Sequence, residues 1–505
     1  MTLPDLDTPP IRRSPRPIGT REAAALDAIF VVAPLRADAC LKQLPEAARW
    51  RALQARAPAR TQQHRSTVLA NTRQTRAVLG TAKADATPFQ RLELAGRMLR
   101  ELGTSRPARI AFLVADDLPQ RAGWYEALLA AALAWNYAPP SFRRERAPRR
   151  ALSAIQLHAA PALDLARITA TARGTNLVRH LTALPPNALD ARAYRRLLGQ
   201  LARRHGLRLR WHSESALRRL GCGAFLAVAR GNAARDAGIA RLVWRGARRR
   251  PGAPVALVGK GVLFDTGGTN LKPHRHMLDM HTDMAGSAVA LATLIALAEL
   301  RAPFAAEAWL AITENNIGPS AYRPQEVVRA ANGTTIQVIH TDAEGRMALA
   351  DTLVLAARRK PRLIVDFATL TGSCVQALTE RYSGVFTNRP ELVSGLQHAG
   401  SASGERVWPF PLDEDFDTDL DSKIADVKQC TVDSKGDHIL AARFLARFVP
   451  TAQHWVHVDL AAATRSGGLA HIEDDITGFG VRFALQLLLE PPAPQRAAGA
   501  GAGRT

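Results

Sequence analysis

The stretch VALVGKGVLFDTGGTNLKPHRHMLDMHTDMAGSA (255–288) decides the fold of this chain. Its first residues predict a buried strand that leads into the loop DTGG (265–268), where glycines let the backbone approach a ligand closely. The run SAVALATLIALAEL (287–300) predicts a helix, and Asp283, taken alone, fits an N-cap at its start. A strand, a loop and a helix in this order form the unit of an α/β sheet, so a site is expected where the strand ends.

A second stretch, TTIQVIHTDAEGRMALADTL (334–353), places three charged side chains after a strand-like run. Asp342, Glu344 and Arg346 stand at alternate positions, so in an extended chain all three project to one side. Carboxylates aimed at one point repel each other unless a proton or a cation lies between them. A solvated acidic turn explains this triplet in isolation. Together with Asp265 and the other aspartate of the first stretch, it predicts a site for hard divalent cations, which prefer oxygen ligands.

The choice of lysine in the first stretch is a further signal. Only 8 of the 67 Lys+Arg residues of the chain are lysine, so arginine is its default positive charge. Lys260 and Lys272 are nevertheless both lysine. Arginine cannot lose its proton, whereas a lysine can when burial or a cation lowers its pKa, and its nitrogen then becomes a ligand. Two ordinary surface lysines are the alternative.

Helix-like and strand-like segments alternate over the rest of the chain. Helices are expected at residues 90–102, 123–138, 163–184 and 192–206. Strands are expected at LRLRWH (207–212), AFLAVA (224–229), ARLVW (240–244), AEAWLAIT (306–313), RLIVDFA (362–368) and HWVHVDL (454–460). The pattern predicts an α/β protein with a smaller N-terminal α/β domain and a larger C-terminal catalytic domain. The central sheet of the larger domain is expected to be mostly parallel, with mixed pairing, and covered by helices.

We place the domain boundaries by composition and by the expected elements. The N-terminal domain spans residues 1–157, with 1–20 expected to be flexible, and a connecting helix lies within 158–186. The catalytic domain spans 187–490. The low-complexity tail PPAPQRAAGAGAGRT (491–505) is expected to be disordered.

Several segments, taken in order along the chain, resemble the leucyl aminopeptidases, also called cytosol aminopeptidases. They are LPPNALD (184–190), LGCGAFLAVARG (220–231), ITENNIGPSAYRPQEVV (312–328), HTDAEGR (340–346), DFATLTGSCVQAL (366–378), HWVHVDLAA (454–462) and ITGFGVRF (476–483). The resemblance covers roughly residues 160–490, and the HTDAEGR segment is its most specific motif.

This resemblance implies hydrolysis of the N-terminal peptide bond of peptides, with leucine-type residues preferred, by a site with two divalent ions: manganese, zinc or magnesium. One ion would be held by Lys260, Asp265, Asp283 and Glu344, and the other by Asp265, Asp342 and Glu344. A water bridging the ions would be the nucleophile, and Lys272 would stabilise the oxyanion. Arg346 would hold a bicarbonate ion that acts as the general base. The substrate pocket would include Met280, Thr369, Leu370 and Gly372. The family also implies a homohexamer.

Two histidines depart from the pattern of the family. The family usually has asparagine at the position of His340 and a basic lysine or arginine at the position of His281. On the extended interpretation His340 has the parity of Asp342, so it would line the pocket or touch a metal ligand. A hydrogen-bonded packing histidine is the alternative.

Composition limits the class of protein. At 505 residues and 47% hydrophobic content the chain can bury a large core. Four cysteines far apart, without a CxxC pair, fit a reducing compartment. We find no signal-peptide segment and no apolar run long enough to span a membrane, so a cytoplasmic protein without a membrane partner is expected.

The positive charge is concentrated in one half of the chain. Residues 1–250 carry 44 Lys+Arg and 17 Asp+Glu, whereas residues 251–505 carry 23 and 28. A cationic half can attract DNA, so a non-catalytic scaffold or a DNA-binding paralogue is the alternative function. An arginine-rich composition on solvated helix faces explains the same charge without a partner.

Overall fold

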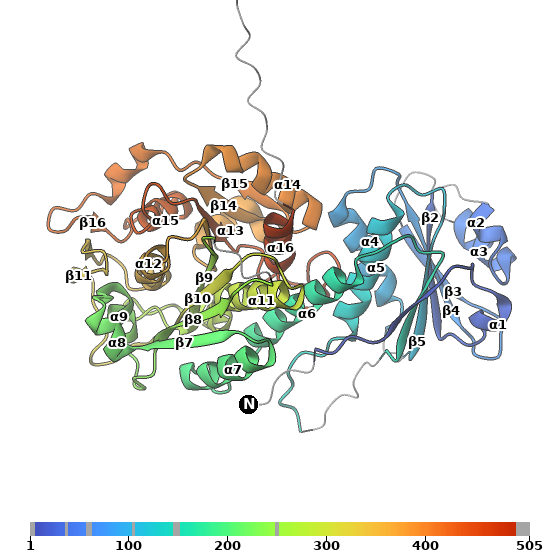
Figure 1. Cartoon of the computed structure of the whole chain (residues 1–505), viewed down its shortest axis with the longest axis horizontal. Coiled ribbons are helices and arrows are strands. Elements are labelled where there is room, and N and C mark those ends of the chain that lie inside the picture. The colour runs from blue at the N-terminus through green and yellow to red at the C-terminus, as the bar shows by residue number, and fades with distance from the viewer. Residues whose placement is uncertain are drawn as a thin grey trace, which may run out of the picture.

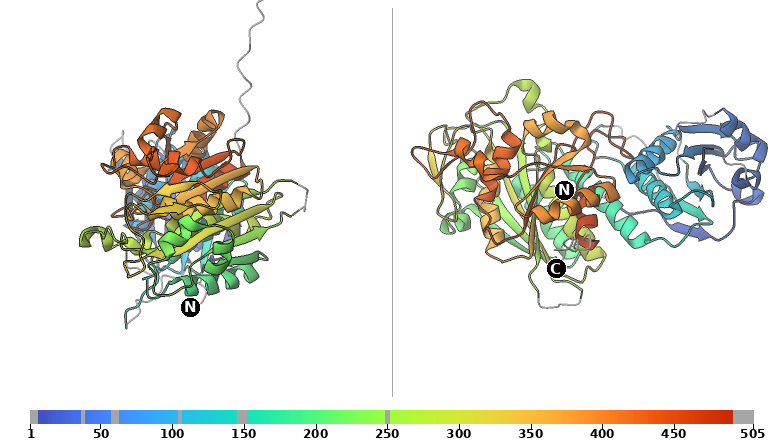
Figure 2. Two further views of the ribbon diagram at one scale, coloured as in Figure 1. Left: turned by 90° about the vertical axis from the view of Figure 1, so that its left-hand side faces the viewer. Right: turned by 90° about the horizontal axis from the view of Figure 1, so that it is seen from above.

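The chain folds into two lobes that lie side by side along the long axis of the molecule (Figure 1). The computed structural model describes residues 6–35, 39–56, 63–103, 107–144, 152–247 and 252–490. The view from above in Figure 2 shows the same separation into a blue and cyan N-terminal lobe and a green to red C-terminal lobe. The predicted α/β class, with a smaller N-terminal part and a larger C-terminal part, is confirmed.

The N-terminal lobe is a sheet with helices on both faces. Its strands are β1 (Ile11–Ser14), β2 (Ala28–Pro34), β3 (Gln63–Val68), β4 (Arg76–Ala82), β5 (Arg109–Val114) and β6 (Ala154–His158). Its helices are α1 (Thr20–Ala23), α2 (Ala39–Lys42), α3 (Ala47–Ala55), α4 (Pro88–Arg100) and α5 (Arg121–Asn136). The strand order is β1-β6-β5-β2-β4-β3, and only β3 runs antiparallel to its neighbour within the described part of the sheet. Alternate residues of β2 pack into two separate cores, one on each face.

Helix α6 (Leu165–Thr182) lies between the two lobes. Its side chains contact both lobes. Asn176 Nδ2 donates to the Leu133 carbonyl of the N-terminal lobe at 3.2 Å, and Arg173 contacts Glu299 of the C-terminal lobe at 2.7 Å. The helix therefore packs on α5 on one side and on the helix that ends at Glu299 on the other (Figure 1).

The C-terminal lobe contains the larger sheet. Its strands are β7 (Arg208–Ser213), β8 (Gly238–Trp244), β9 (Val255–Asp265), β10 (Ala306–Asn315), β13 (Leu363–Ala368), β14 (Ser383–Thr387), β15 (Val407–Pro409) and β17 (Trp455–Asp459). A small second sheet contains β11 (Val327–Arg329), β12 (Thr335–Gln337) and β16 (Val427–Lys428). The order in the larger sheet is β15-β14-β17-β13-β9-β10-β8-β7. Its centre, from β17 to β10, is parallel, and antiparallel pairs lie toward both edges.

Helices cover both faces of this sheet. They are α7 (Ala191–Arg204), α8 (Glu214–Arg219), α9 (Gly223–Ala229), α10 (His274–Met277), α11 (Ala285–Glu299), α12 (Glu344–Ala357), α13 (Gly372–Leu378), α14 (Val393–Ser403), α15 (Asp437–Ala446) and α16 (Val481–Leu489), with 3-10 turns η1 (Met280–Thr282), η2 (Thr379–Arg381), η3 (Pro390–Leu392) and η4 (Glu414–Leu420). Val255 and Leu257 of β9 pack into the core under α11, whereas Ala256 and Val258 pack into the core under α12. Burial of both faces explains why the first residues of β9, Val255–Val258, are a continuous apolar run and do not alternate.

Three local expectations were wrong. AFLAVA (224–229) lies in helix α9 and not in a strand, because a short apolar run has no periodicity that separates the two. The run 334–340 forms strand only at Thr335–Gln337, in the small sheet. The first 20 residues are not flexible throughout, since Ile11–Ser14 form β1 and pair in parallel with β6. The tail 491–505 lies outside the described residues.

One stretch differs from the expectation that no apolar run is long enough to span a membrane. His274–Glu299 is long and apolar enough to cross a membrane by length and composition. Its most apolar window is 83% buried inside the protein, where α11 packs between the sheet and α6. This stretch therefore contains a core helix of the larger lobe.

Candidate active site

Strand β9 carries the first two residues of the predicted site. Lys260 is paired in register with Ala311 of the neighbouring strand, and Asp265 is the last residue of β9. The register between β9 and β10 shifts by one residue after Thr313, which brings Asn315 opposite Asp265, and Asn315 Nδ2 donates to Asp265 Oδ1 at 2.8 Å. The site therefore lies at the carboxyl end of the central parallel strands, where an α/β sheet forms a crevice.

The glycine-rich loop after β9 fixes the next lysine. Gly267 has a φ of +87°, and a Cβ there would lie 2.4 Å from the Asn270 carbonyl oxygen and 3.0 Å from Asp342 Oδ1. A side chain at this position would therefore be strained by the backbone and would crowd the site. The Lys272 amide donates a hydrogen bond of 2.9 Å to the Thr266 carbonyl, so the loop folds back on itself and Lys272 lies over the end of β9.

Asp283 lies just before helix α11, but Met284 is the N-cap residue, so the N-cap interpretation is wrong. The side chain is 6% exposed and turns toward the sheet. Its Oδ1 accepts a hydrogen bond of 2.7 Å from Thr369 Oγ1, which follows β13. Thr369 also accepts a hydrogen bond of 2.9 Å from Lys260 Nζ at its carbonyl oxygen, so it links the two charged residues.

The second stretch does not stay extended. Helix α12 begins at Glu344, so Asp342 lies in the preceding loop while Glu344 and Arg346 lie in the first helical turn. Glu344 still points to the site, whereas Arg346 points to another wall of the same pocket. The extended interpretation was wrong because the apolar helical residues follow the charged ones without a break, and nothing in the triplet itself separates a strand end from a helix start.

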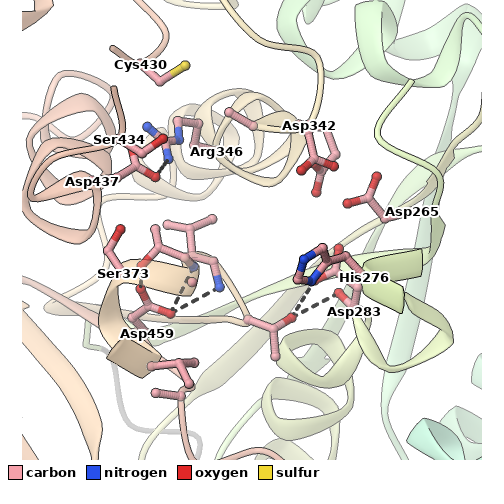
Figure 3. A pocket seen from close by; sticks show the side chains of 18 of the residues that line it. Asp265, His276, Asp283, Asp342, Arg346, Ser373, Cys430, Ser434, Asp437 and Asp459 are labelled. Carbon is pink, nitrogen blue, oxygen red and sulfur yellow. Dashed lines mark hydrogen bonds and ion pairs between the residues drawn. The ribbon is translucent and has the colours of Figure 1, made fainter. Parts of the chain in front are cut away.

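These residues converge on one point. Lys260 Nζ lies 2.8 Å from Asp283 Oδ2 and 2.9 Å from Glu344 Oε1. Lys272 Nζ lies 3.0 Å from Asp265 Oδ2 and 2.5 Å from Asp342 Oδ1. Figure 3 shows the three aspartates close together on one side of the pocket. Ligand atoms of Asp265, Asp342 and Glu344 lie within 4.8 Å of one another, close enough to hold a common metal ion.

Burial dominates the titration of the carboxyl groups. Removal from water raises the pKa of Asp283 to about 6, although the Lys260 ammonium beside it opposes the shift. Burial also raises the pKa of Asp265, Asp342 and Glu344. Their negative charges are therefore only partly compensated by the lysines.

The two lysines respond in the opposite way. Burial alone lowers the pKa of a lysine, but the surrounding carboxylates raise the pKa of both Lys260 and Lys272 above the ordinary value. Both amines are therefore protonated in the metal-free protein. A metal ion has to displace a proton before the Lys260 amine becomes a ligand.

Arg346 is buried on the opposite wall, with 2% of its surface exposed. Its Nη2 donates to Asp437 Oδ2 at 2.6 Å, and its Nη1 donates to the Gln429 carbonyl at 3.1 Å. Figure 3 shows Arg346 and Asp437 next to each other, away from the three aspartates. The family resemblance implied a bicarbonate ion at Arg346, and in the structure the anion beside it is the Asp437 carboxylate.

The cluster lies in a pocket of about 700 Å³. All the residues proposed for substrate binding line this pocket: Met280, His340, Thr369, Leu370 and Gly372. His340 Nδ1 accepts a hydrogen bond of 3.3 Å from the Asp342 amide, so it touches the backbone of a charged residue rather than its carboxylate. His281, the other unusual histidine, lies in η1 and is half-buried beside Asp279.

The sequence did not identify several other residues of the pocket. Asp459 is the last residue of β17, and its carboxylate accepts hydrogen bonds from the Leu370 amide at 3.1 Å and the Thr371 hydroxyl at 2.7 Å. It thus holds the loop that carries Thr369. Its place at the end of a strand was a usable signal. His276 and Asp437 also line the pocket, and both follow irregular segments whose path the sequence does not predict.

Comparison with known proteins identifies the family. A model described as "Cytosol aminopeptidase family, catalytic domain" matches residues 176–485, more than half of the chain. The chain belongs to the cytosol aminopeptidase family. It is therefore a metal-dependent aminopeptidase that acts on peptides, and the predicted resemblance is confirmed.

Relatives of this aminopeptidase share much of its length. A probable cytosol aminopeptidase of Parasynechococcus marenigrum (strain WH8102) is 40% identical over 386 residues, which are 74% of this chain and 78% of the relative. One of Rhodopseudomonas palustris (strain BisA53) is 36% identical over 425 residues, 81% of this chain and 83% of the relative.

Two solved structures have the same fold. The bottromycin maturation enzyme BotP in complex with Mn is 30% identical, with a TM-score of 0.79 over 91% of this chain and 98% of that one. A tomato leucine aminopeptidase mutant, 23% identical, has a TM-score of 0.84 over 96% of this chain and 97% of that one.

The charges of the aminopeptidase site fit divalent cations. Four carboxylates face two ammonium groups, so the cluster carries excess negative charge in a buried place. Asp283 Oδ2, Asp342 Oδ1 and Glu344 Oε1 are buried and, apart from the neighbouring ammonium groups, accept no hydrogen bond from the described part of the chain. Buried, partly compensated oxygen atoms are the ligands that Mn²⁺, Mg²⁺ and Zn²⁺ take.

Proposed function

We propose that the aminopeptidase holds two divalent cations, manganese, zinc or magnesium, in the buried carboxylate cluster. Lys260, Asp265, Asp283 and Glu344 would hold one ion, and Asp265, Asp342 and Glu344 the other. The single observation that carries this proposal is the convergence of these side chains from β9, the start of α11 and the start of α12. The manganese bound by BotP supports the choice of metal.

When bound, two such cations lower the pKa of a water molecule and polarise the carbonyl of the scissile bond. The residues of the chain do the rest. Lys272 lies on the pocket wall with its ammonium group at the ends of Asp265 and Asp342, where it would stabilise negative charge that develops on the carbonyl oxygen. It is fixed there before substrate binds, so little reorganisation is needed.

The acidic cluster also explains the choice of an N-terminal residue. With the cations bound, the free α-amino group of the substrate would lose its proton and bind one of them through its nitrogen at the cluster end of the pocket, as the resemblance implies. Met280 and Leu370, with Thr369 and Gly372, border this region and favour an apolar side chain of the leucine type. An internal peptide bond has no such amino group and would not be positioned for attack.

We further propose a homohexamer in the cytoplasm, supported by membership of a family whose relatives are named cytosol aminopeptidases. The division into 1–157, 158–186 and 187–490 is supported by separate cores in the two lobes. The alternative, a non-catalytic scaffold or a DNA-binding paralogue, is not favoured, because a scaffold needs no buried cluster of four carboxylates.

The test uses chelated protein reloaded with Mn²⁺, Zn²⁺ or Mg²⁺. We expect turnover of leucine p-nitroanilide after reloading, and none of its N-acetylated form, which lacks a free amino group. Lys272→Met should keep the metal content and lower kcat. Absence of turnover on a panel of aminoacyl p-nitroanilides with every metal, in protein that binds the metals, would contradict the proposal.

A further inference from the structure

The guanidinium of Arg346 is one of the most buried charges of the molecule, with 2% of its side chain exposed. A cation in such a place is stable only with a compensating anion and hydrogen-bond acceptors. Asp437 supplies the anion at 2.6 Å, and the Gln429 carbonyl supplies a further acceptor at 3.1 Å. The charge of Arg346 is therefore already balanced by the chain itself, although its buried Nε has no hydrogen-bond partner in the described residues.

One oxygen of the Asp437 carboxylate has no hydrogen-bond partner in the described residues. Its Oδ2 is bound to Arg346, whereas Oδ1 is buried and has no hydrogen-bond partner in the described part of the chain. Asp437 and Arg346 both line the pocket that holds the carboxylate cluster. Figure 3 shows the pair on the wall opposite Asp265 and Asp342. The pair thus presents a fixed carboxylate to the pocket.

From this geometry we propose that Asp437 is the resident anion of Arg346, so that the enzyme uses its own carboxylate where dissolved bicarbonate was expected. The inference rests on the proposed aminopeptidase site. Asp437 acts through Arg346, and we regard it as a positioning residue: it holds the guanidinium and supplies the negative charge of this wall.

A second anion would meet a poor site in the wild-type protein. It would lie within a few ångströms of the Asp437 carboxylate, and like charges at such a distance repel strongly in a buried environment. Loss of the Asp437 carboxylate reverses the situation, because it leaves a buried guanidinium without a counter-charge. The site would then recruit an anion from solution.

An ordinary structural role is the competing explanation. Asp437 is the first residue of α15, where a carboxylate interacts favourably with the helix dipole. In that case its removal would lower stability without making the protein respond to dissolved anions. Anion dependence is therefore the measurement that separates the two explanations.

The experiment compares the wild type with Asp437→Gly and Asp437→Ala in carbonate-free buffer. The side chain lost in the glycine variant, CH₂COO⁻, and bicarbonate have the same number of non-hydrogen atoms, and formate fits the smaller space in the alanine variant. We expect wild-type activity to stay flat over a bicarbonate titration. Each variant should lose activity and recover by about 10- to 100-fold with its matching anion, as for a charge-assisted hydrogen bond.

A second measurement does not depend on catalysis. Bicarbonate and formate should raise the Tm of the variants and leave that of the wild type unchanged, because only the variants have an empty place beside Arg346. Asp417→Ala is the matched control. Asp417 binds Arg443 with two hydrogen bonds of 2.7 Å, outside the pocket, so its loss frees an arginine without creating the proposed site.

Three results would overturn the inference. The first is stimulation of the wild type by bicarbonate. The second is a folded Asp437 variant whose activity and Tm do not change with bicarbonate or formate. The third is an Asp417→Ala protein that responds to these anions as strongly as the Asp437 variants. If the glycine and alanine variants do not fold, Asp437→Asn keeps the shape and removes the charge, and full activity of this variant without anions would also overturn it. A wild type without any turnover contradicts the proposed function, while the Tm measurements still decide the role of Asp437.

Discussion

Replacement of Gly345 by alanine should disable the site while the protein stays folded. A Cβ atom at this position would lie 2.6 Å from both Cε and Nζ of Lys260, whereas ordinary contacts are 3.4–4 Å. Lys260 cannot move away into solvent, because it is 3% exposed. Its Nζ is also held at 2.8 Å from Asp283 and at 2.9 Å from Glu344.

The size of the effect follows from these distances. The amine has to retreat by about 0.8 Å, the difference between 2.6 and 3.4 Å, and metal ligands tolerate only about 0.2 Å. We expect metal affinity to fall about 10- to 100-fold, and kcat/KM on the order of 100-fold. Gly345 lies in α12, where alanine favours the helix by about 1 kcal/mol, which offsets part of the roughly 1–3 kcal/mol cost of crowding.

The assay measures metal content by mass spectrometry and hydrolysis of leucine p-nitroanilide on the same samples. Gly199→Ala is the control, because Gly199 also lies within a helix, α7, and its nearest atom, Arg203 Nη1, is 3.8 Å from the new Cβ. This control should keep both values. A folded Gly345→Ala protein with wild-type metal content and activity would refute the reasoning.

Four further results are expected. Asp342→Ala should lower metal content and reduce activity by at least about 100-fold with a native circular dichroism spectrum; unchanged turnover would remove Asp342 from the site. Metal affinity should rise with pH through about 6, because burial raises the pKa of Asp283 to about 6 and its proton competes with the cation; calorimetry at pH 5.5 and 7.5 checks this. The pKa of Asp283 rises from 3.8 in the unfolded chain to about 6 in the folded one, so the folded state holds this proton more tightly. The metal-free protein should therefore lose stability as pH rises from about 4 through 6, and a Tm that rises over this range would contradict this prediction. Asp351→Ala should lower the free energy of unfolding by about 1–3 kcal/mol for each amide it leaves unpaired, those of Phe225 and Ala331, as measured by urea denaturation, whereas Asp351→Asn keeps one acceptor and should lose less.

Much of the fold follows from the sequence because the central strands are buried on both faces. The apolar run at β9 predicted a buried strand and the small-residue run at α11 predicted a helix, and the structure has both. AFLAVA (224–229) was misassigned because helix α9 is held by a distant group, the Asp351 carboxylate that accepts from the Phe225 amide. A tertiary hydrogen bond of this kind leaves no trace in the local pattern.

The residues of the site likewise separate into those that the sequence predicts and those that it does not. Lys260 and Asp265 follow from the strand that carries them, and the rarity of lysine marked both amines. Asp437 could not be found, because it follows an irregular segment, and its partner Arg346 is distant in the sequence. The direction of Arg346 depended on whether the chain after Asp342 was helical, which only the packed structure decides.

The burial of the two amines of the proposed site has a practical consequence. The side chains of Lys260 and Lys272 are 4% and 13% exposed and each lies between carboxylates. Reagents that modify primary amines would reach the six other lysines of the chain first. Covalent immobilisation through lysine would therefore use few anchor points and leave the amines of the working site unmodified.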